Sequence, residues 1–435
     1  MDLPSHPQTG TVPFREATRA WARVAAHSFG GPAGQIAVIH RVVVDEKKWL
    51  DEEQFLHALG YCMLLPGPEA QQLATYVGWL LHGTRGGLVA GLLFILPGFL
   101  SILALSILYA TFGHLGLVAA VFFGLKPAVL AIVLEALARL KSRALPTSAS
   151  KWIAAAAFVA IFVFRVPFPW IILAAGLLGY LLHRLPTTAE PTVESRGTGP
   201  SFGRLARTGG VWLLIWLAPV AGLLAALGPE HVLVREAAFF SKTAVVTFGG
   251  AYAVLAYLAQ QAVEVFGWLT PGEMLDGLGL AETTPGPLIM VVQFVGYLAA
   301  SREMGIAPIL GGIAGSVVTT WVTFAPCFLF IFAGAPYVEW LRGHRALSAA
   351  MSGIMAAVAG VVLNLAVWFA LHVVFGTVGT REVGPARFWV PELATLNVAA
   401  LLIAIAAAIA VFRSRVGMVA VLGGGAVRGV VGWGV

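Results

Sequence analysis

Long apolar stretches separated by short polar loops run through almost the whole chain. A helix needs about 20 consecutive apolar residues to cross a lipid bilayer. The hydropathy pattern predicts about thirteen such segments, of which the last is weak, at 20–44, 55–82, 86–111, 115–138, 151–166, 167–183, 208–228, 236–264, 274–300, 305–334, 346–375, 391–412 and 416–435. We therefore expect an all-α polytopic membrane protein with about 10–13 transmembrane helices.

One polar stretch interrupts this pattern near the middle of the chain. Residues 184–207 are rich in Pro, Thr, Ser, Glu and Gly, a composition typical of a linker. The linker separates a first transmembrane repeat at 1–183 from a second repeat at 208–435, which begins with one extra helix.

The two halves share a repeated motif pattern. Residues 29–68 align without gaps to residues 248–287, at an offset of 219, with 12 identities in 40 positions. Seven predicted spans separate equivalent helices, and an odd number places the two copies in opposite orientation, as in the inverted repeats of secondary transporters. The repeated motifs are Phe29-Gly30-Gly31 with Phe248-Gly249-Gly250, and Pro66-Gly67-Pro68 with Pro285-Gly286-Pro287.

Composition and charge narrow the class of protein further. Hydrophobic residues make up 59% of the chain and charged residues only 11%, against about 25% charged in soluble domains. This excludes a soluble enzyme and a disordered chain. The net charge of +6 resides mostly in short loops. It therefore indicates membrane topology, with a cytoplasmic N-terminus, rather than nucleic-acid binding. No residues have metal-ligand spacing, and we expect no metal and no cofactor.

The FGG and PGP motifs predict breaks in the helices that contain them. Proline removes a backbone donor and clashes with the preceding turn. Freed backbone groups are tolerated at membrane depth only where protein or a wet cavity surrounds them. A helix that restarts after such a break presents free N–H groups and a positive dipole end, which suit an anion. The alternative is that each motif only kinks its helix for packing. The presence of both motifs in both repeats, at the same spacing, favours an anion-binding site.

Three cations lie inside apolar segments and are candidates for substrate binding. Arg23 and Lys242 each precede an FGG motif by six residues, so they are equivalent in the two repeats. A pseudo-two-fold axis would bring them towards one centre. Lys126 stands beside Pro127 without a charged counterpart in the second half. The alternatives are snorkelling to the interface for Arg23 and Lys242, and a structural salt bridge for Lys126.

Acidic and polar side chains near the breaks complete the candidate set. Glu69 follows the first PGP, Glu282 precedes the second, and Glu135 lies near the end of its span. Each is a candidate for ion or proton coupling, although the helix dipole alone also accounts for Glu69. Gln71, Thr283 and Thr284 could donate hydrogen bonds to a substrate. The alternative is that they are polar side chains that only pack between helices. Cations together with helix N-termini favour a small dianion as the substrate.

At these motifs the chain resembles the chromate ion transporter (CHR) family in its long, two-domain form. The stretches that carry the resemblance are SFGGPAGQIAVIH (28–40), FLHALGYCMLLPGPEAQQLATYVGWLLHG (55–83), KTAVVTFGGAYAVL (242–255) and ETTPGPLIMVVQFVGY (282–297). The resemblance implies chromate efflux across the bacterial inner membrane, driven by the proton motive force or by exchange with sulfate. It also makes the paired FGG and PGP blocks the signature regions. The glycine-rich tail departs from it.

Three other functions compete with this prediction. An importer of sulfate or another oxyanion would use the same kind of site. A membrane-embedded enzyme would need a nucleophile–base pair or an acid-rich metal cluster, and the sequence offers neither. A structural scaffold leaves the embedded cations unexplained. The expected partners are chromate, sulfate and the lipid bilayer, with a homodimer as a candidate assembly.

Overall fold

The structure, a computed structural model, divides into two compact units. It describes residues 12–29, 31–113, 115–183, 202–248, 251–337, 345–413 and 418–432. Unit 1 comprises Met1–Leu105, Glu194–Ala251 and Thr284–Gly343, and unit 2 comprises Ser106–Val193, Tyr252–Thr283 and His344–Val435. Each unit therefore takes segments from both halves of the sequence. That the halves themselves are repeats of opposite orientation stays a prediction.

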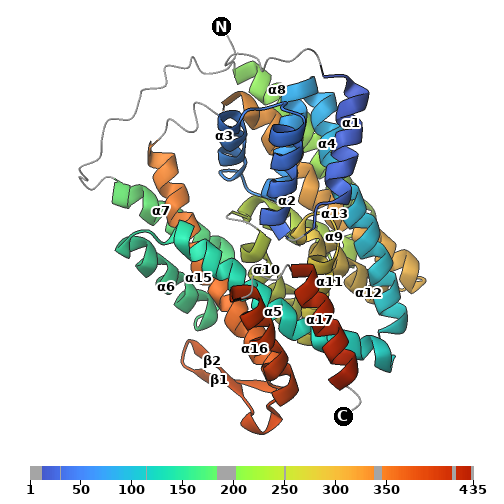
Figure 1. Ribbon diagram of the computed structural model, residues 1–435, viewed down its shortest axis with the longest axis vertical. Helices are drawn as coiled ribbons and strands as arrows, with labels where there is room; N and C mark the ends of the chain where they lie inside the picture. The colour runs from blue at the N-terminus through green and yellow to red at the C-terminus, as the bar shows by residue number, and fades with distance from the viewer. Residues whose placement is uncertain are drawn as a thin grey trace. The chain divides into compact units, whose positions relative to one another are not determined.

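Unit 1 is built from helices and short helical turns (Figure 1). Its elements are α1 (Phe14–Ala26), α2 (Gly31–His40), the π-helix η1 (Arg41–Glu46), α3 (Glu52–Cys62), most of α4 (Glu69–Phe112), α8 (Phe202–Leu227), α9 (Val232–Val246), η3 (Leu288–Met290), α12 (Val291–Glu303), α13 (Pro308–Gly334) and η4 (Ala335–Tyr337).

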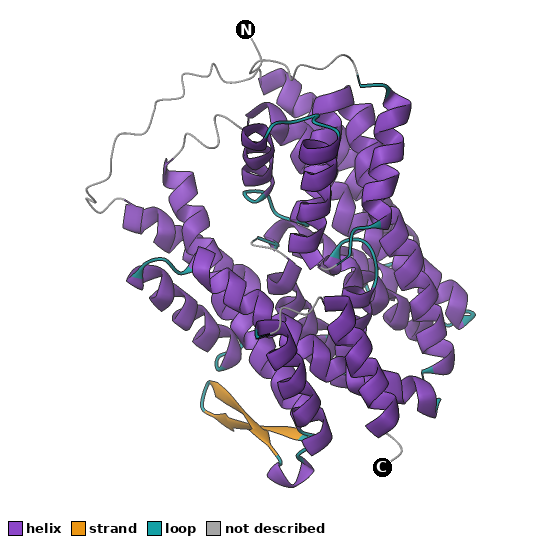
Figure 2. Ribbon diagram, viewed as in Figure 1, coloured by secondary structure: helices purple, strands orange, loops and turns teal. Residues whose placement is uncertain are grey.

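Among its described residues, unit 2 is also helical, apart from one pair of strands (Figure 2). Its elements are α5 (Gly116–Ala144), α6 (Ser148–Phe162), α7 (Phe168–His183), nearly all of α10 (Ala251–Ala259), the π-helix η2 (Gln260–Val265), α11 (Pro271–Thr283), α15 (Arg345–Val374), β1 (Val378–Val383), β2 (Ala386–Pro391), η5 (Leu393–Thr395), α16 (Val398–Phe412) and α17 (Met418–Gly432).

The predicted class, an all-α multi-pass membrane protein, is confirmed. In the described residues, five helices are long and apolar enough to cross a membrane: Glu69–Phe112, Gly116–Lys141, Leu205–Leu227, Pro308–Gly334 and Ala346–Val374. Four shorter apolar helices accompany them. Side chains such as Leu214 on α8 and Leu173 on α7 are 68% and 62% exposed. A bilayer would cover such apolar faces, which a water-soluble protein would have to hide.

Helix α4 is two helices joined by a sharp turn. His82 and Gly83 have non-helical backbone angles, and Gly83 has a φ of 60°. The two arms pack closely, because a Cβ atom at Gly86 would lie only 2.2 Å from the carbonyl oxygen of Gly78. The turn lies at the boundary that hydropathy predicts between segments 55–82 and 86–111.

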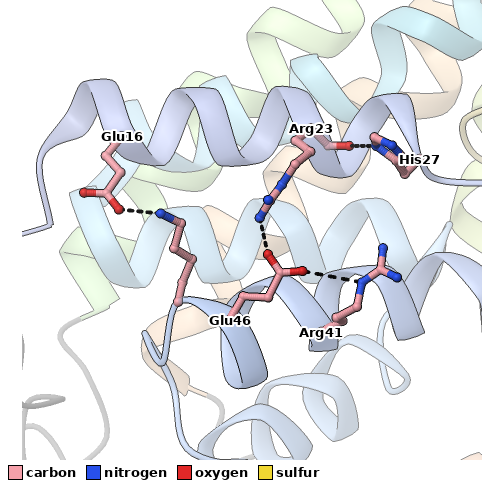
Figure 3. A network of polar contacts seen from close by, with 6 residues as sticks. Glu16, Arg23, His27, Arg41 and Glu46 are labelled. Atoms are coloured by element: carbon pink, nitrogen blue, oxygen red, sulfur yellow. Dashed lines mark hydrogen bonds and ion pairs between the residues drawn. The ribbon is translucent and has the colours of Figure 1, made fainter.

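The first predicted span, 20–44, is not a single crossing. Helix α1 ends at Ala26, and the chain returns through α2 and η1. Glu16 at the start of α1 accepts a hydrogen bond of 2.7 Å from Lys47, directly after η1 (Figure 3). A continuous helix of this length would separate the two residues by about 46 Å. The segment is a helical hairpin, which breaks the regular alternation of sides that thirteen successive crossings would give.

The predicted span 236–264 is also wrong as a single crossing, as the contacts of Glu264 at its end show. Glu264 forms ion pairs with Arg165 at 3.2 Å and with Arg387 at 2.7 Å, all within unit 2. If the thirteen predicted spans alternated, both arginines would lie on one side of the membrane and Glu264 on the other. The chain is interrupted after α9, so residues 236–264 are not one continuous crossing either.

A β-hairpin between α15 and α16 is the main element that the hydropathy pattern misses (Figure 1). Strands β1 and β2 are antiparallel, with Val378 opposite Pro391 and Val383 opposite Ala386. Gly384 in the turn has a φ of 59°, a conformation that favours glycine. Arg387 of β2 lies over the ring of Trp389, at 4.5 Å from its centroid.

The weak last span forms a helix, α17, which packs on α5 within unit 2. A Cβ atom at Gly124 of α5 would lie 1.9 Å from the carbonyl oxygen of Gly425, and one at Gly429 would lie 2.2 Å from the carbonyl oxygen of Ala120. Glycines on both helices therefore allow backbone-to-backbone contact, which is a common way for membrane helices to pack. The glycine-rich tail has a packing role.

Candidate functional site

Four helix interruptions lie in unit 1, at the places where the sequence has its motifs. Helices stop between α1 and α2, between α3 and α4, between α9 and α10, and between α11 and η3. We call Ser28, Gly67, Thr247 and Gly286, one residue from each interruption, the break cluster. Gly30, Gly249 and Gly250 lie outside the described residues. Phe29 is exposed, Gly31 begins α2, and Phe248 is half-buried.

Two backbone hydrogen bonds join the break cluster across the two halves of the sequence. The N–H of Gly67 donates to the carbonyl oxygen of Thr247 at 2.8 Å, and the N–H of Gly286 donates to that of Ser28 at 2.9 Å. Donors and acceptors are each related by the 219-residue offset of the repeat. Each PGP motif is thus bonded to the residue that precedes the FGG motif of the other half.

Both central glycines of the PGP motifs are required by geometry. Gly67 has a φ of 121° and Gly286 has a φ of 96°, a region that L side chains rarely adopt. A Cβ atom at Gly286 would lie 2.8 Å from the Cα atom of Gly98, and one at Gly67 would lie 2.8 Å from Nε2 of Gln72. The prolines on either side, Pro66, Pro68, Pro285 and Pro287, are buried or half-buried.

Buried amide side chains flank the break cluster. Gln35 donates to the carbonyl oxygen of Gly286 at 2.5 Å, and Gln72 donates to that of Pro66 at 2.6 Å. Gln71 donates to the hydroxyl of Thr75 at 3.0 Å, and Gln293 donates to the carbonyl of Phe99 at 3.0 Å. The Oε1 atoms of Gln71, Gln72 and Gln293 have no hydrogen-bond partner among the described residues. Buried polar atoms usually have a partner, so these amides are candidates for ligand contacts.

The two threonines of the second PGP segment differ in their surroundings. Thr284 is buried, and the hydroxyl of the half-buried Thr283 donates to the carbonyl oxygen of Leu280 at 2.9 Å. Thr283 has thus already used its hydroxyl hydrogen on the backbone, so it would have to give up this bond to donate to a substrate.

Arg23 lies in an exposed network of charges on α1 and η1 (Figure 3). Its guanidinium forms an ion pair with Glu46, whose other oxygen lies 3.7 Å from Nε of Arg41. The side chain of Arg23 is 47% exposed. Lys242 on α9 is likewise exposed. The structure places both cations in unit 1, and it shows Arg23 already held by a carboxylate.

Lys126 lies in unit 2 and is held by an acid that the sequence analysis missed. Its Nζ atom is 3.0 Å from Oδ1 of Asp276, and the hydroxyl of Tyr109 donates to Oδ2 of Asp276 at 2.8 Å. Asp276 is 8% and Lys126 26% exposed in the side chain. The salt bridge that the sequence left open for Lys126 is therefore present.

The acids chosen as coupling candidates have different surroundings. Glu135 pairs with Arg139 at 2.9 Å, one turn along α5. Glu282 is buried and accepts a hydrogen bond of 2.8 Å from Tyr252. Glu69 is half-buried at the start of α4.

Glu236 on α9 is a second acid that the sequence analysis missed. It is fully buried, and its carboxylate oxygens have no hydrogen-bond partner among the described residues. A search for acids inside apolar segments would have found both Glu236 and Asp276.

The described residues contain no group of three or more His, Cys, Asp or Glu side chains that could hold a metal ion. The candidate residues offer backbone donors, amides and cations, groups that can bind an anion.

Comparison with known proteins decides the family. A family model described as chromate transporter matches residues 15–180 and 235–430. The chain belongs to the chromate transporter family. The match covers both halves and leaves out the linker and all of α8, as expected of the two-domain form.

Curated relatives of this family cover most of the chain. A chromate transport protein of Pseudomonas aeruginosa is 34% identical over 338 residues, covering 77% of this chain and 76% of the relative. A chromate transport protein of Cupriavidus metallidurans is 28% identical, covering 83% of each chain. A probable chromate transport protein of Synechococcus elongatus is 29% identical, covering 81% of this chain and 84% of the relative. No solved structure matches significantly.

Proposed function

We propose that this protein is a secondary transporter that exports chromate from the bacterial cytoplasm. Membership of the chromate transporter family and the names of its curated relatives support chromate transport and speak against an enzyme. The apolar helices support a location in the inner membrane. The single observation that carries the mechanism is the break cluster, in which interruptions from both halves are bonded to one another.

The break cluster supplies two things that a transporter of dianions needs. Helices that begin after the interruptions have positive dipole ends that favour an anion, and the N–H groups of Gly67 and Gly286 become available when their bonds to Thr247 and Ser28 open. Interruptions also act as hinges, because their residues absorb changes in backbone angles while the helices stay rigid. The bonds at Gly67 and Gly286 would break and re-form as access alternates between the two sides. Gln71 and Thr284 are the side chains that we propose as neutral contacts to the oxyanion.

Electrostatic attraction comes from Arg23, Lys126 and Lys242 in this proposal. Two of these cations have carboxylate partners in the structure, Glu46 and Asp276. An arriving dianion would have to compete with those partners, and the competition would keep binding reversible.

The most detailed part of the proposal concerns the ions to which chromate export is coupled. Sulfate shares the charge and tetrahedral shape of chromate, so we propose it as a competing or exchanged ion. Glu69, Glu135 and Glu282 are proposed as groups that couple transport to protons or exchange, with Glu282 the most deeply buried of the three.

Uptake of radiolabelled chromate into inside-out vesicles tests the proposed function. Vesicles that contain the protein should accumulate more chromate than vesicles from the same cells without it. External sulfate should compete, and collapse of the pH gradient should slow uptake if protons drive export. Chromate entry into intact cells in place of vesicles, with increased chromate sensitivity, would contradict export and support an importer.

A further inference from the structure

The buried ion pair of Lys126 and Asp276 in unit 2 is built from three separate segments of the chain. Lys126 is on α5, Asp276 is on α11, and Tyr109 lies in the last turn of α4. Each oxygen of the carboxylate faces its own partner, Lys126 at 3.0 Å and Tyr109 at 2.8 Å. The carboxylate is therefore held from two sides, and Asp276 is the acid that pairs with the Lys126 ammonium in the part of the chain that the structure describes.

The surroundings of the Lys126 ammonium favour negative charge. Gly272, in the first turn of α11, has no side chain, and a Cβ atom there would lie 3.8 Å from Nζ of Lys126. The ammonium thus lies beside the N-terminal turn of a 13-residue helix, where the dipole adds partial positive charge. Glu273 in the same turn offsets part of this charge, since it accepts a hydrogen bond from the N–H of Thr270 at 2.8 Å.

The pair also has a degree of access that the other buried acids lack. The side chain of Lys126 remains 26% exposed while that of Asp276 is 8% exposed. Lys126 is therefore the more accessible partner of the pair. An embedded ion pair that is partly open on its cationic side is expensive to maintain for packing alone, because apolar residues of the same volume are as stable or more stable.

We infer that Lys126 is a binding station for the transported oxyanion and that Asp276 is its tethered competitor. In the absence of an anion, Asp276 neutralises Lys126. When a tetrahedral dianion binds, Lys126 turns from Asp276 to the anion, and Tyr109 keeps its hydrogen bond to the carboxylate. The returning carboxylate then helps to expel the anion, because a tethered group competes at a high effective concentration. This inference rests on the proposed function and assigns Asp276 a role in affinity.

Substitution of the competitor should strengthen binding. In Asp276→Asn the amide keeps the shape but loses the charge, so we expect the KM for chromate to fall by about three- to tenfold, a range typical of one modest electrostatic contact. Tyr109→Phe should raise KM modestly, because the carboxylate loses the hydrogen bond that holds it while Lys126 binds the anion. Lys126→Met should raise KM. Lys141→Gln on the same helix is the matched control, since Lys141 is exposed near the end of α5, and it should leave KM unchanged.

The double variant Lys126→Met/Asp276→Asn separates binding from a structural role. It removes both charges, so a purely structural pair would leave the double variant folded and transporting normally. Our inference requires that it folds but transports with a raised KM, because the cation is gone.

The experiment measures chromate uptake by vesicles at several concentrations, for the wild type and these variants at matched protein levels. A lower KM in Asp276→Asn, together with the defect of the double variant, supports the inference. An unchanged or higher KM in Asp276→Asn overturns it; if that variant does not fold, an unchanged KM in Tyr109→Phe overturns it. Absence of uptake by the wild type would instead refute the proposed function, before any variant is compared.

Discussion

Arg23 and Lys126 are both cations inside apolar segments of the sequence, yet the structure gives them opposite surroundings. Arg23 is 47% exposed and belongs to a chain of charges on one helical hairpin, with Glu46 and Arg41 (Figure 3). Lys126 is 26% exposed and faces a nearly buried Asp276 that comes from another helix. An exposed pair contributes about 0–1 kcal/mol to stability. Loss of one partner from a buried pair is far more destabilising. We therefore expect Lys126 to contribute much more to the stability of unit 2 than Arg23 contributes to that of unit 1.

The largest effect is expected for Lys126→Ala. It leaves the Asp276 carboxylate buried without its cation, which should lower the free energy of unfolding by about 3–5 kcal/mol. The amount of folded protein and its melting temperature in detergent, measured by size-exclusion chromatography after heating, would report this loss. A wild-type melting temperature for Lys126→Ala would contradict the claim that the Lys126–Asp276 pair contributes more to stability than the Arg23–Glu46 pair.

Gly286→Ala should be next in size, and it tests a region held by backbone geometry instead of charge. Its φ of 96° and the 2.8 Å approach to Gly98 make a methyl group strained, at about 1–3 kcal/mol. We expect chromate uptake to be lost, because the bond from Gly286 to Ser28 shifts. Gly222→Ala is the matched control, since a Cβ atom there meets nothing within 4 Å and alanine favours a helix. Equal uptake in both variants would contradict the hinge role of the break cluster.

Arg23→Ala should have a smaller effect on stability, no more than about 1 kcal/mol, because water already solvates the pair. Chromate uptake by Arg23→Ala then shows whether this exposed cation attracts the anion. If Arg23 attracts the anion, KM rises while the melting temperature stays the same, and Lys242→Ala behaves alike. If neither variant changes KM, Arg23 and Lys242 take no part in binding and the hairpin network only holds α1 against η1.

Glu46→Gln should have the smallest effect of all. It removes the partner of an exposed cation, so KM for chromate should remain within about twofold of the wild type, as expected for a solvent-screened pair. The same uptake assay as for Asp276→Asn measures it. A drop in KM as large as that expected for Asp276→Asn would mean that exposure does not distinguish the two pairs.

Hydropathy and motif spacing predict the helical segments well, and the reasons for the failures are physical. The turn at Gly83 and the interruptions at the PGP motifs follow from residues with strong local preferences. The hairpin of α1 and α2 was missed although α1 differs from a crossing helix: it carries Arg15, Glu16, Arg19 and Arg23 and is amphipathic. The contact between Glu16 and Lys47 confirms that the chain folds back.

In the candidate site, too, the sequence identifies single residues but not the distant partners that the fold brings to them. Lys126 stands out in the sequence because a charge in an apolar segment is rare. Its partner Asp276 is 150 positions away, and nothing in the local pattern pairs them. The bonds from Gly67 to Thr247 and from Gly286 to Ser28 are equally distant. The repeat predicts that the motifs belong together, whereas the hydrogen-bond partners come only from the fold.

Reconstitution of the purified protein in liposomes tests the central claim most directly. Liposomes loaded with sulfate and diluted into radiolabelled chromate should accumulate chromate through the protein, and sulfate added outside should compete. The account predicts accumulation above that of empty liposomes, and a loss of accumulation in Gly286→Ala. Equal chromate content in protein-containing and empty liposomes, with and without gradients of sulfate and pH, would contradict the claim that this chain transports chromate.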